Sequence, residues 1–215
     1  MKAIRIHNYG GPEVLRYEEV VVPTPDAGEL LIKVQAASVN PLDWKTRAGY
    51  LKDFFPHSLP FIPGWDGSGV VEAVGSGVTK FKEGDEVYAK TNRDGTYAEY
   101  AIVTETEAAL KPKSVDHVQA AAIPVVALTA WQALFEKAQL AAGQKILIHA
   151  AAGGVRAEML GMQPNSAQLA EIAKLVDSGH VKVVVERILP LSEARQAHEL
   201  SEKGRVRGKL VLKVG

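Results

Sequence analysis

Short apolar runs separated by glycine and proline dominate the first hundred residues of this chain. Candidate strands cover residues 2–7, 30–37, 67–74, 86–89 and 98–104. Turn signals such as Tyr9-Gly10-Gly11-Pro12 and Ile62-Pro63-Gly64 lie between them. Because most of these strands have no helix-length connection between them, the pattern predicts an antiparallel barrel or sandwich.

Near residue 114 the pattern changes to helical spacing. From Val118 to Leu140 the chain is rich in alanine, and apolar residues recur at helical spacing, with one proline at Pro124. The apolar run 146–150 is typical of a strand buried in a parallel sheet, and it leads into Ala151-Ala152-Gly153-Gly154-Val155. We expect four further elements: a helix from Ser166 to a stop at Gly179, a strand over 181–187, a serine-capped helix over 192–203 and a strand over 209–214.

The composition of the chain argues against several kinds of binding partner and chemistry. Lys+Arg and Asp+Glu are equal at 25 each, and we find no basic run, so no electrostatic case exists for nucleic acid or an anionic membrane. The chain has no cysteine, which excludes disulfides, thiolate nucleophiles and cysteine-ligated zinc. No run of about 18 apolar residues predicts a membrane span. The first residues look like a strand and not like a signal sequence, so a cytoplasmic protein is expected.

Motif searches for other chemistry are negative. The six histidines have no metal-ligand spacing, and we interpret them as structural or surface groups. A Gly-x-Ser-x-Gly elbow, which would support a hydrolase, is absent from the sequence.

A series of short segments, in this order, resembles the zinc-independent quinone oxidoreductase branch of the medium-chain dehydrogenase/reductase superfamily. The segments are Asn40-Pro41-Leu42-Asp43-Trp44, Ile62-Pro63-Gly64-Trp65-Asp66, Gly84-Asp85-Glu86-Val87, Gly95-Thr96-Tyr97-Ala98-Glu99-Tyr100, Leu128-Thr129-Ala130-Trp131, residues 150–155 and Arg207-Gly208-Lys209-Leu210-Val211-Leu212. The resemblance implies a mainly β fold with an α/β part, a GroES-like barrel plus a truncated Rossmann-like remnant. We expect residues 1–125 and 187–215 to form the GroES-like catalytic domain and 126–186 the remnant.

The sequence differs from the wider superfamily at the positions of the zinc ligands and in the nucleotide-binding domain. Zinc-dependent members carry a cysteine near the position of Val39-Asn40, and a Gly-His-Glu where this chain has Gly64-Trp65-Asp66. An indole N–H is only a donor, so Trp65 cannot ligate a metal, and we expect it to fill that space. After Val155 the chain continues as Arg156-Ala157-Glu158, which resembles sequence from near the end of the nucleotide-binding domain. Most of that domain is therefore expected to be missing, since a doubly wound domain needs two βαβαβ halves.

The resemblance also implies site residues. Asn40 and Tyr50 are the candidate catalytic residues, and both would also contact an NADPH cofactor, together with Thr129. Asn40 would bond a substrate carbonyl or the nicotinamide ribose. For Thr129 the alternative is a bond back to its own helix. The diphosphate would lie over the glycine turn of Ala152, Gly153, Gly154 and Val155. For Asp43 and Arg47 we favour a local ion pair at i,i+4 spacing.

Two functions follow as alternatives. One is an NADPH-dependent quinone or enone reductase that transfers hydride without a metal, with impaired activity in this chain. The other is a catalytically silent GroES-like domain that self-associates or binds a partner, because the strand at 146–150 has lost the neighbours that would cover it. A homo-oligomer is expected in the second case.

Overall fold

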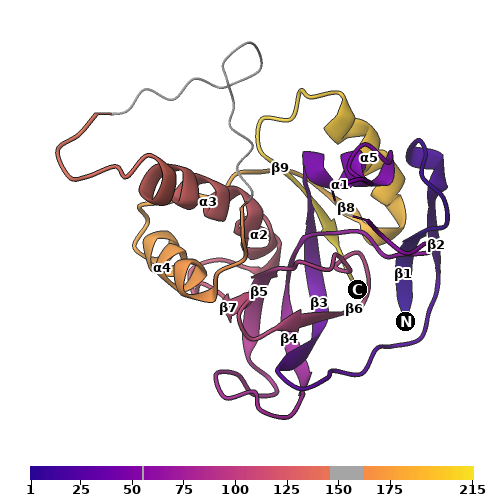
Figure 1. Cartoon of the computed structure of the whole chain (residues 1–215), viewed down its shortest axis with the longest axis horizontal. Helices are drawn as coiled ribbons and strands as arrows, with labels where there is room; N and C mark the ends of the chain where they lie inside the picture. The colour runs from indigo at the N-terminus through magenta and orange to yellow at the C-terminus, as the bar shows by residue number, and fades with distance from the viewer. Residues whose placement is uncertain (55, 146–161) are drawn as a thin grey trace.

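Most of the strands predicted for the first hundred residues lie in one mostly antiparallel sheet (Figure 1). The computed structural model describes residues 1–54, 56–145 and 162–215. The expected strand at 146–150 and the turn at 152–155 lie outside the described residues. Among the described residues the strands are β1 (Lys2–Ile6), β2 (Leu15–Glu19), β3 (Glu29–Val39), β4 (Asp66–Val74), β5 (Glu86–Lys90), β6 (Tyr100–Thr104), β7 (Ala108–Leu110), β8 (Val185–Pro190) and β9 (Lys209–Lys213).

Strand β3 is the centre of the sheet. It pairs with β4 on one side, and on the other with β6 along Glu29–Lys33 and with β9 along Ala36–Val39. The order is β7-β5-β4-β3-β9-β8, while β1 and β2 pair separately. Nearly all residues of β3 are buried, which agrees with its apolar sequence.

Helices cover the sheet in two groups (Figure 1). The helices α2 (His117–Ala121), α3 (Pro124–Trp131) and α4 (Ser166–Asp177) pack over Tyr88 of β5 and Ala109 of β7. The helices α1 (Pro41–Arg47) and α5 (Ala194–Glu202) contact each other at the other side of the sheet. The prediction of a mainly β fold with an α/β part is confirmed, and the division at residues 125 and 187 stays a prediction.

The helical spacing over 118–140 corresponds to more than one helical element. The segment is divided into α2, α3 and a π-helical turn over Gln132–Lys137. Pro124 is the first residue of α3, a position that tolerates a missing N–H. Gln132 then bonds the Gln163 backbone in both directions, at 2.8 and 3.0 Å, and so fixes the chain just before α4.

Several predicted boundaries also need correction. The strand expected over 181–187 is β8, which starts at Val185 because its partner β9 begins at Lys209. The helix expected from Ser192 starts at Ala194, since Ser192 lies in a 3-10 turn. Helix α4 begins at Ser166 as predicted, but its cap is Asn165, whose side chain accepts from Gln168 N. Three elements, β2, β7 and α1, were not predicted.

Candidate active site

The register of the sheet brings three polar residues together at one end of β3. Asn40 directly follows β3 and caps α1. Ser38 pairs with Asp66, the first residue of β4, and Val39 pairs with Leu210, the second residue of β9. The side chains of Asn40, Asp66 and Lys209 therefore meet here, and with Ser38 and Asp43 we call them the Asp66 cluster.

The carboxylate of Asp66 is the hub of this cluster. It is fully buried, and it accepts hydrogen bonds from Ser38 Oγ at 2.8 Å, Asn40 Nδ2 at 3.0 Å and Val125 N at 3.0 Å. Burial raises the pKa of Asp66, although Lys209 and these hydrogen bonds oppose the rise. The bond to Val125 N satisfies one of the free N–H groups at the start of α3.

The side chain of Asn40 is held from both ends. Its Nδ2 donates to Asp66, and to Ser38 Oγ at 3.5 Å, while its Oδ1 accepts from Lys209 Nζ. Lys209 Nζ also donates to Val39 O at 3.4 Å. Asn40 is only 2% exposed, so its amide is part of the interior.

Asp43 lies beneath Asn40 and does not form the ion pair with Arg47 that we predicted. Its Oδ2 accepts from Asn40 N at 2.6 Å, a capping contact that aims the carboxylate away from Arg47. Its Oδ1 and the hydroxyl of Tyr97 are both buried without a well-formed hydrogen bond within the described ranges. Burial raises the pKa of Asp43 well above its usual range, and Asp94 and Asp66 add to the rise.

Arg47 is instead the centre of a second buried network, the Arg47 cluster of Gly10, Arg47, His198 and Glu202. Its guanidinium donates to Gly10 O at 3.1 Å, to His198 Nδ1 at 3.3 Å and to Glu202 Oε1. Arginine is only a donor, so His198 Nδ1 must be an acceptor and the ring is neutral. Burial, followed by the charge of Arg47, lowers the pKa of His198 to about 3.

Trp65 is a wall of the site, as predicted. Its side chain is 4% exposed, and Lys90 Nζ lies 4.6 Å from the centroid of its ring. Lys90 donates to Asn92 Oδ1 at 2.8 Å, and burial lowers its pKa to about 8. Gly64 sets the position of Trp65, because its φ is +106° and a Cβ there would lie 2.4 Å from both Thr96 Oγ1 and Tyr97 Cδ1.

The other predicted site residues are less closely gathered. Tyr50 is 70% exposed and its ring meets Trp44 edge-on at 6.2 Å. Thr129 Oγ1 donates to Val125 O at 2.6 Å, which is the helix contact named as its alternative. Ala152, Gly153, Gly154 and Val155 lie outside the described residues. The roles of Asn40, Tyr50 and Thr129 therefore remain predictions.

Sequence reasoning missed Asp66, Lys209 and Lys90 as members of the site. The signal for Lys90 was a lysine directly after the buried run Val87-Tyr88-Ala89. Lys209 and Asp66 lie inside segments that resemble the family. Neither residue was singled out there as a candidate site residue. Only the pairing of three strands brings Asp66 and Lys209 to the same point.

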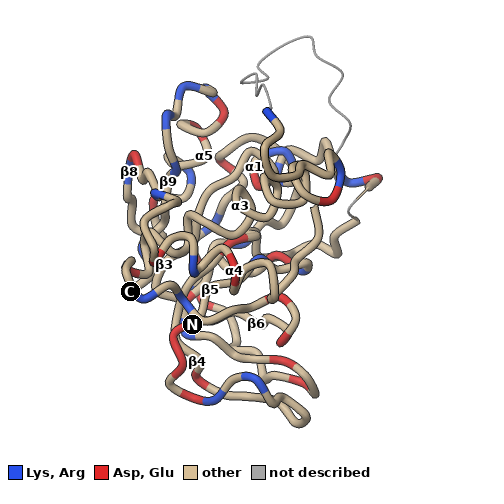
Figure 2. Tube along the Cα trace, turned by 90° about the vertical axis from the view of Figure 1, so that its left-hand side faces the viewer, with Lys and Arg blue, Asp and Glu red and all other residues tan. Residues whose placement is uncertain are grey.

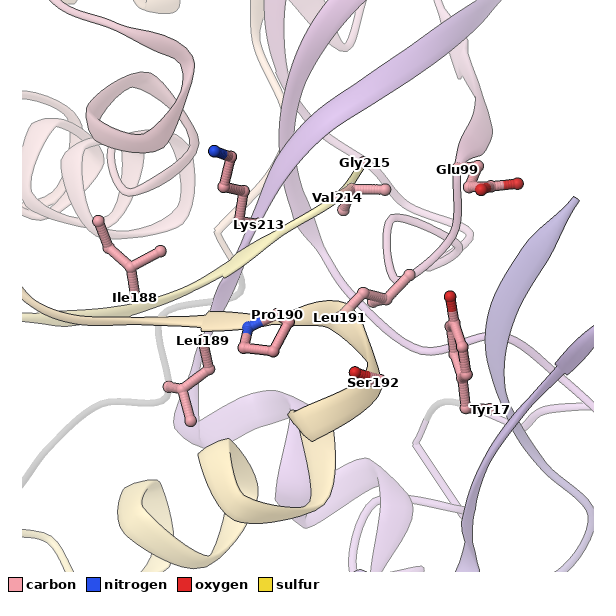
Figure 3. A pocket seen from close by; sticks show the side chains of 10 residues that line it. All are labelled: Tyr17, Glu99, Ile188, Leu189, Pro190, Leu191, Ser192, Lys213, Val214 and Gly215. Carbon is pink, nitrogen blue, oxygen red and sulfur yellow. The ribbon is translucent and has the colours of Figure 1, made fainter.

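An open hollow of about 470 Å³ lies at another part of the molecule, where β8 and β9 end (Figure 3). The residues that line it include Tyr17, Glu99 and Lys213. None of these groups belongs to the Asp66 cluster, and Glu99 already accepts from Lys2 N at 2.7 Å. We therefore place the candidate site at the Asp66 cluster.

The Asp66 cluster does not fit a zinc ion. Trp65 stands where zinc-dependent members have a histidine, and the charges of two ammonium groups, Lys90 and Lys209, both act on Asp66. Within the described ranges, no group of three or more His, Asp or Glu side chains could hold a metal.

Comparison with known proteins identifies the family. Residues 26–113 match the alcohol dehydrogenase GroES-like domain, and residues 83–212 match the zinc-binding dehydrogenase family. Quinone oxidoreductase from Rattus norvegicus is 42% identical over 156 residues, which cover 72% of this chain and 47% of that protein. A chloroplastic quinone-oxidoreductase homolog from Spinacia oleracea is 44% identical over 163 residues, covering 72% and 50%. The chain thus spans about half the length of the curated relatives it matches.

Solved structures agree on the fold. A quinone oxidoreductase from Coxiella burnetii superposes with a TM-score of 0.89 at 28% identity, covering 100% of this chain and 99% of that one. An NAD-dependent alcohol dehydrogenase superposes with a TM-score of 0.86 at 26% identity, with 100% of each chain covered. The chain belongs to the zinc-binding dehydrogenase family and, within the medium-chain dehydrogenase/reductase superfamily, to its quinone oxidoreductase branch.

Proposed function

We propose that this chain is part of a reductase that transfers hydride from a nicotinamide cofactor, NADPH by family resemblance, to a quinone or enone without a metal ion. The observation that carries the proposal is the Asp66 cluster. It presents a buried, hydrogen-bonded set of donors at the end of β3, next to Asn40, which we predicted from the sequence as a catalytic residue. The quinone oxidoreductase relatives support this activity over the silent-domain alternative.

The chain's own residues would orient the substrate and stabilise charge. A bound nicotinamide supplies hydride, and the exposed ring of Tyr50 offers an aromatic surface against which a planar ring can lie. The donors of the Asp66 cluster are held in place before substrate arrives, so they stabilise charge on a carbonyl oxygen at little reorganisation cost. We also propose a small-molecule quinone or enone as the partner.

Location and assembly stay predictions. None of the helices in the described part of the chain is long and apolar enough to cross a membrane. Positively and negatively charged residues are both spread along the chain trace (Figure 2), and that nucleic acid is not a partner belongs to this proposal. The cytoplasmic location and the homo-oligomer expected from the sequence belong to this proposal.

The test is a cofactor titration followed by a turnover assay. We expect nicotinamide fluorescence to change at micromolar NADPH, and absorbance at 340 nm to fall when tetramethyl-1,4-benzoquinone is added. NADH in place of NADPH measures the phosphate preference. Unchanged fluorescence at millimolar cofactor, with no quinone-dependent oxidation, contradicts the proposed function for this chain.

A matched pair of variants locates the site. Asn40→Ala should lower kcat/KM by about a hundredfold, because loss of the amide frees both Asp66 and Lys209 to move from their positions. Asn8→Ala removes an exposed asparagine whose Nδ2 donates only to Tyr9 O, and it should leave kcat/KM unchanged within about twofold. Equal effects of the two variants would place the reaction elsewhere.

A further inference from the structure

Two ammonium groups, Lys90 and Lys209, lie among the buried carboxylates of the candidate site. Three carboxylates, Asp43, Asp66 and Asp94, are no more than 3% exposed. Asp94 is paired with His57, whose Nε2 lies 2.5 Å from Asp94 Oδ2. Lys90 is held by Asn92 and by the ring of Trp65. The charge of Lys90 interacts with Asp66, Glu107 and Asp94, whereas that of Lys209 interacts with Asp66 and Asp43 next to Asn40.

Lys209 is bound to neutral acceptors and not to a carboxylate. An ammonium group has three N–H donors. The Nζ of Lys209 donates to Asn40 Oδ1 and to Val39 O, and it forms no ion pair with a carboxylate of the described residues. Among the described residues the third N–H of Lys209 therefore has no acceptor, and it can bond an external oxygen.

Asn40 is less able than Lys209 to donate a hydrogen bond to an external oxygen. Its Oδ1 is occupied by Lys209, and the two hydrogens of Nδ2 are directed to Asp66 Oδ2 and Ser38 Oγ. Ser38 Oγ in turn donates to Asp66, so it is free to accept. A substrate oxygen that bonded Asn40 would have to break one of these contacts, whereas Lys209 can bond it without a loss.

We propose that Lys209 is the residue that binds the carbonyl oxygen of the substrate and stabilises the negative charge that forms on it. The inference rests on the proposed quinone or enone reduction. Hydride addition to a carbon of the conjugated system brings two electrons, and the π pair of the C=O bond moves to oxygen. The oxyanion is held by Lys209, and one proton from Lys209 or from water completes the reduced product. If Lys209 gives the proton, it regains one from water.

The same contacts explain how a member of a zinc-binding family dispenses with zinc. The metal would serve as a Lewis acid for the same oxygen. Here the ammonium of Lys209 supplies the positive charge, and it would repel a divalent cation from Asp66 and Asp43. We expect the purified protein to bind less than a tenth of an equivalent of zinc, which about one bound zinc per chain would contradict.

The kinetic test uses Lys209→Met, Lys209→Arg and the control Lys213→Met. Lys213 lies on the same strand with an exposed side chain. Lys209→Met should lower kcat/KM for tetramethyl-1,4-benzoquinone by about 10²–10³-fold, the usual cost of losing an oxyanion donor. Lys209→Arg should recover part of this loss, and Lys213→Met should stay within about twofold of wild type. A Lys209→Met variant within threefold of wild type overturns the proposal.

The pH profile separates a charge role from a merely structural one. Burial lowers the pKa of Lys209 below its ordinary 10.5, while Asp66 on β4 and Asp43 on α1 oppose the shift. The wild-type kcat/KM should therefore fall as pH rises through that lowered pKa, and in Lys209→Arg this alkaline loss should disappear. The same alkaline limb in both proteins would overturn the role of Lys209.

A binding readout does not depend on turnover. In protein labelled with 13Cε-lysine, the resonance absent from Lys209→Arg identifies Lys209. We expect this resonance to shift with saturation as the fully substituted, non-alkylating quinone is added, while that of Lys213 stays fixed. A shift without turnover would support Lys209 and contradict the proposed reductase. Turnover without a shift would keep the reductase and contradict Lys209.

Discussion

The two ends of helix α1 carry buried polar clusters that differ in how their charged groups are paired. At the C-terminal end, the donors of Arg47 meet Gly10 O, His198 Nδ1 and Glu202 Oε1. At the N-terminal end, Asp43 Oδ1 has no well-formed hydrogen bond, and one N–H of Lys209 has no acceptor among the described residues. His198 Nε2 is also buried without a hydrogen bond among the described residues, so the two clusters differ in charge pairing and not in saturation. The charge of Arg47 is paired with Glu202, whereas Lys209 contacts neutral acceptors.

Tyr97 lies between the two clusters. Its ring meets His198 edge-on at 5.8 Å, and its hydroxyl is close enough to Asp43 for that carboxyl to raise its pKa, after the larger effect of burial. Tyr97 therefore connects the Arg47 cluster to the Asp66 cluster through its contacts with His198 and Asp43. Each of the following variants tests one side of this contrast.

The largest effect is expected for Arg47→Met. Removal of the guanidinium leaves three acceptors without their donor, one of them a carboxylate, and should lower the free energy of unfolding by about 3 kcal/mol or more. Urea denaturation measures this directly. The control Arg187→Met, an exposed arginine on β8, should change stability by less than about 0.5 kcal/mol. Similar losses in both variants would show that the Arg47 cluster has no special structural role.

His198→Gln should reduce the sensitivity of the fold to acid. The folded protein keeps His198 neutral down to a pKa of about 3, whereas the unfolded chain takes up a proton below 6.5. Stability is therefore lost as pH falls through this window, by about 1.4 kcal/mol for each pH unit below 6.5. We expect the variant to lose about 2 kcal/mol less than wild type between pH 6.5 and pH 5. His180→Gln, on an exposed histidine, serves as the control.

Asp43→Asn tests the opposite slope in the Asp66 cluster. The pKa of Asp43 is raised in the folded protein, so the folded state binds this proton more tightly than the unfolded chain. Stability should then fall as pH rises above the ordinary pKa of 3.8, and an uncharged asparagine removes this loss. The melting temperature of the variant relative to wild type should be higher at pH 8 than at pH 5. Asp53→Asn, an exposed control, should show no such difference.

The sequence was most informative where local pattern decides the structure. Strand β3 follows from an apolar run with both edges occupied, and the ends of α4 and α5 follow from Gly179 and Gly204, which have φ of +77° and +65°. Helix α1 was also within reach, because Asn40, Pro41 and Asp43 are an N-cap, a first-turn proline and an acidic residue at the third position.

The partners of the buried charged groups could not be predicted from local sequence pattern. The i,i+4 spacing of Asp43 and Arg47 suggested an ion pair, yet the partner of Arg47 is Glu202, 155 residues away in the chain. Lys209 reaches Asn40 across 169 residues. Such contacts depend on which strands are neighbours, and that is a property of the whole sheet. Family resemblance supplied Asn40 as a candidate, but not the residues that hold it.

The smallest effect is expected for Thr129→Val. This variant tests whether a hydroxyl that already has a hydrogen-bond partner in the free protein can also bind a cofactor. Thr129 Oγ1 already donates to Val125 O, so the substitution removes a helix contact that contributes little to stability. We expect the free energy of unfolding to change by less than about 1 kcal/mol, and the NADPH dissociation constant to stay within about twofold. A tenfold weaker dissociation constant with unchanged stability would show that Thr129 exchanges its helix contact for the cofactor. Pairing in the free protein would then not identify the groups that remain available for binding, and the inference from Lys209 would lose its main support.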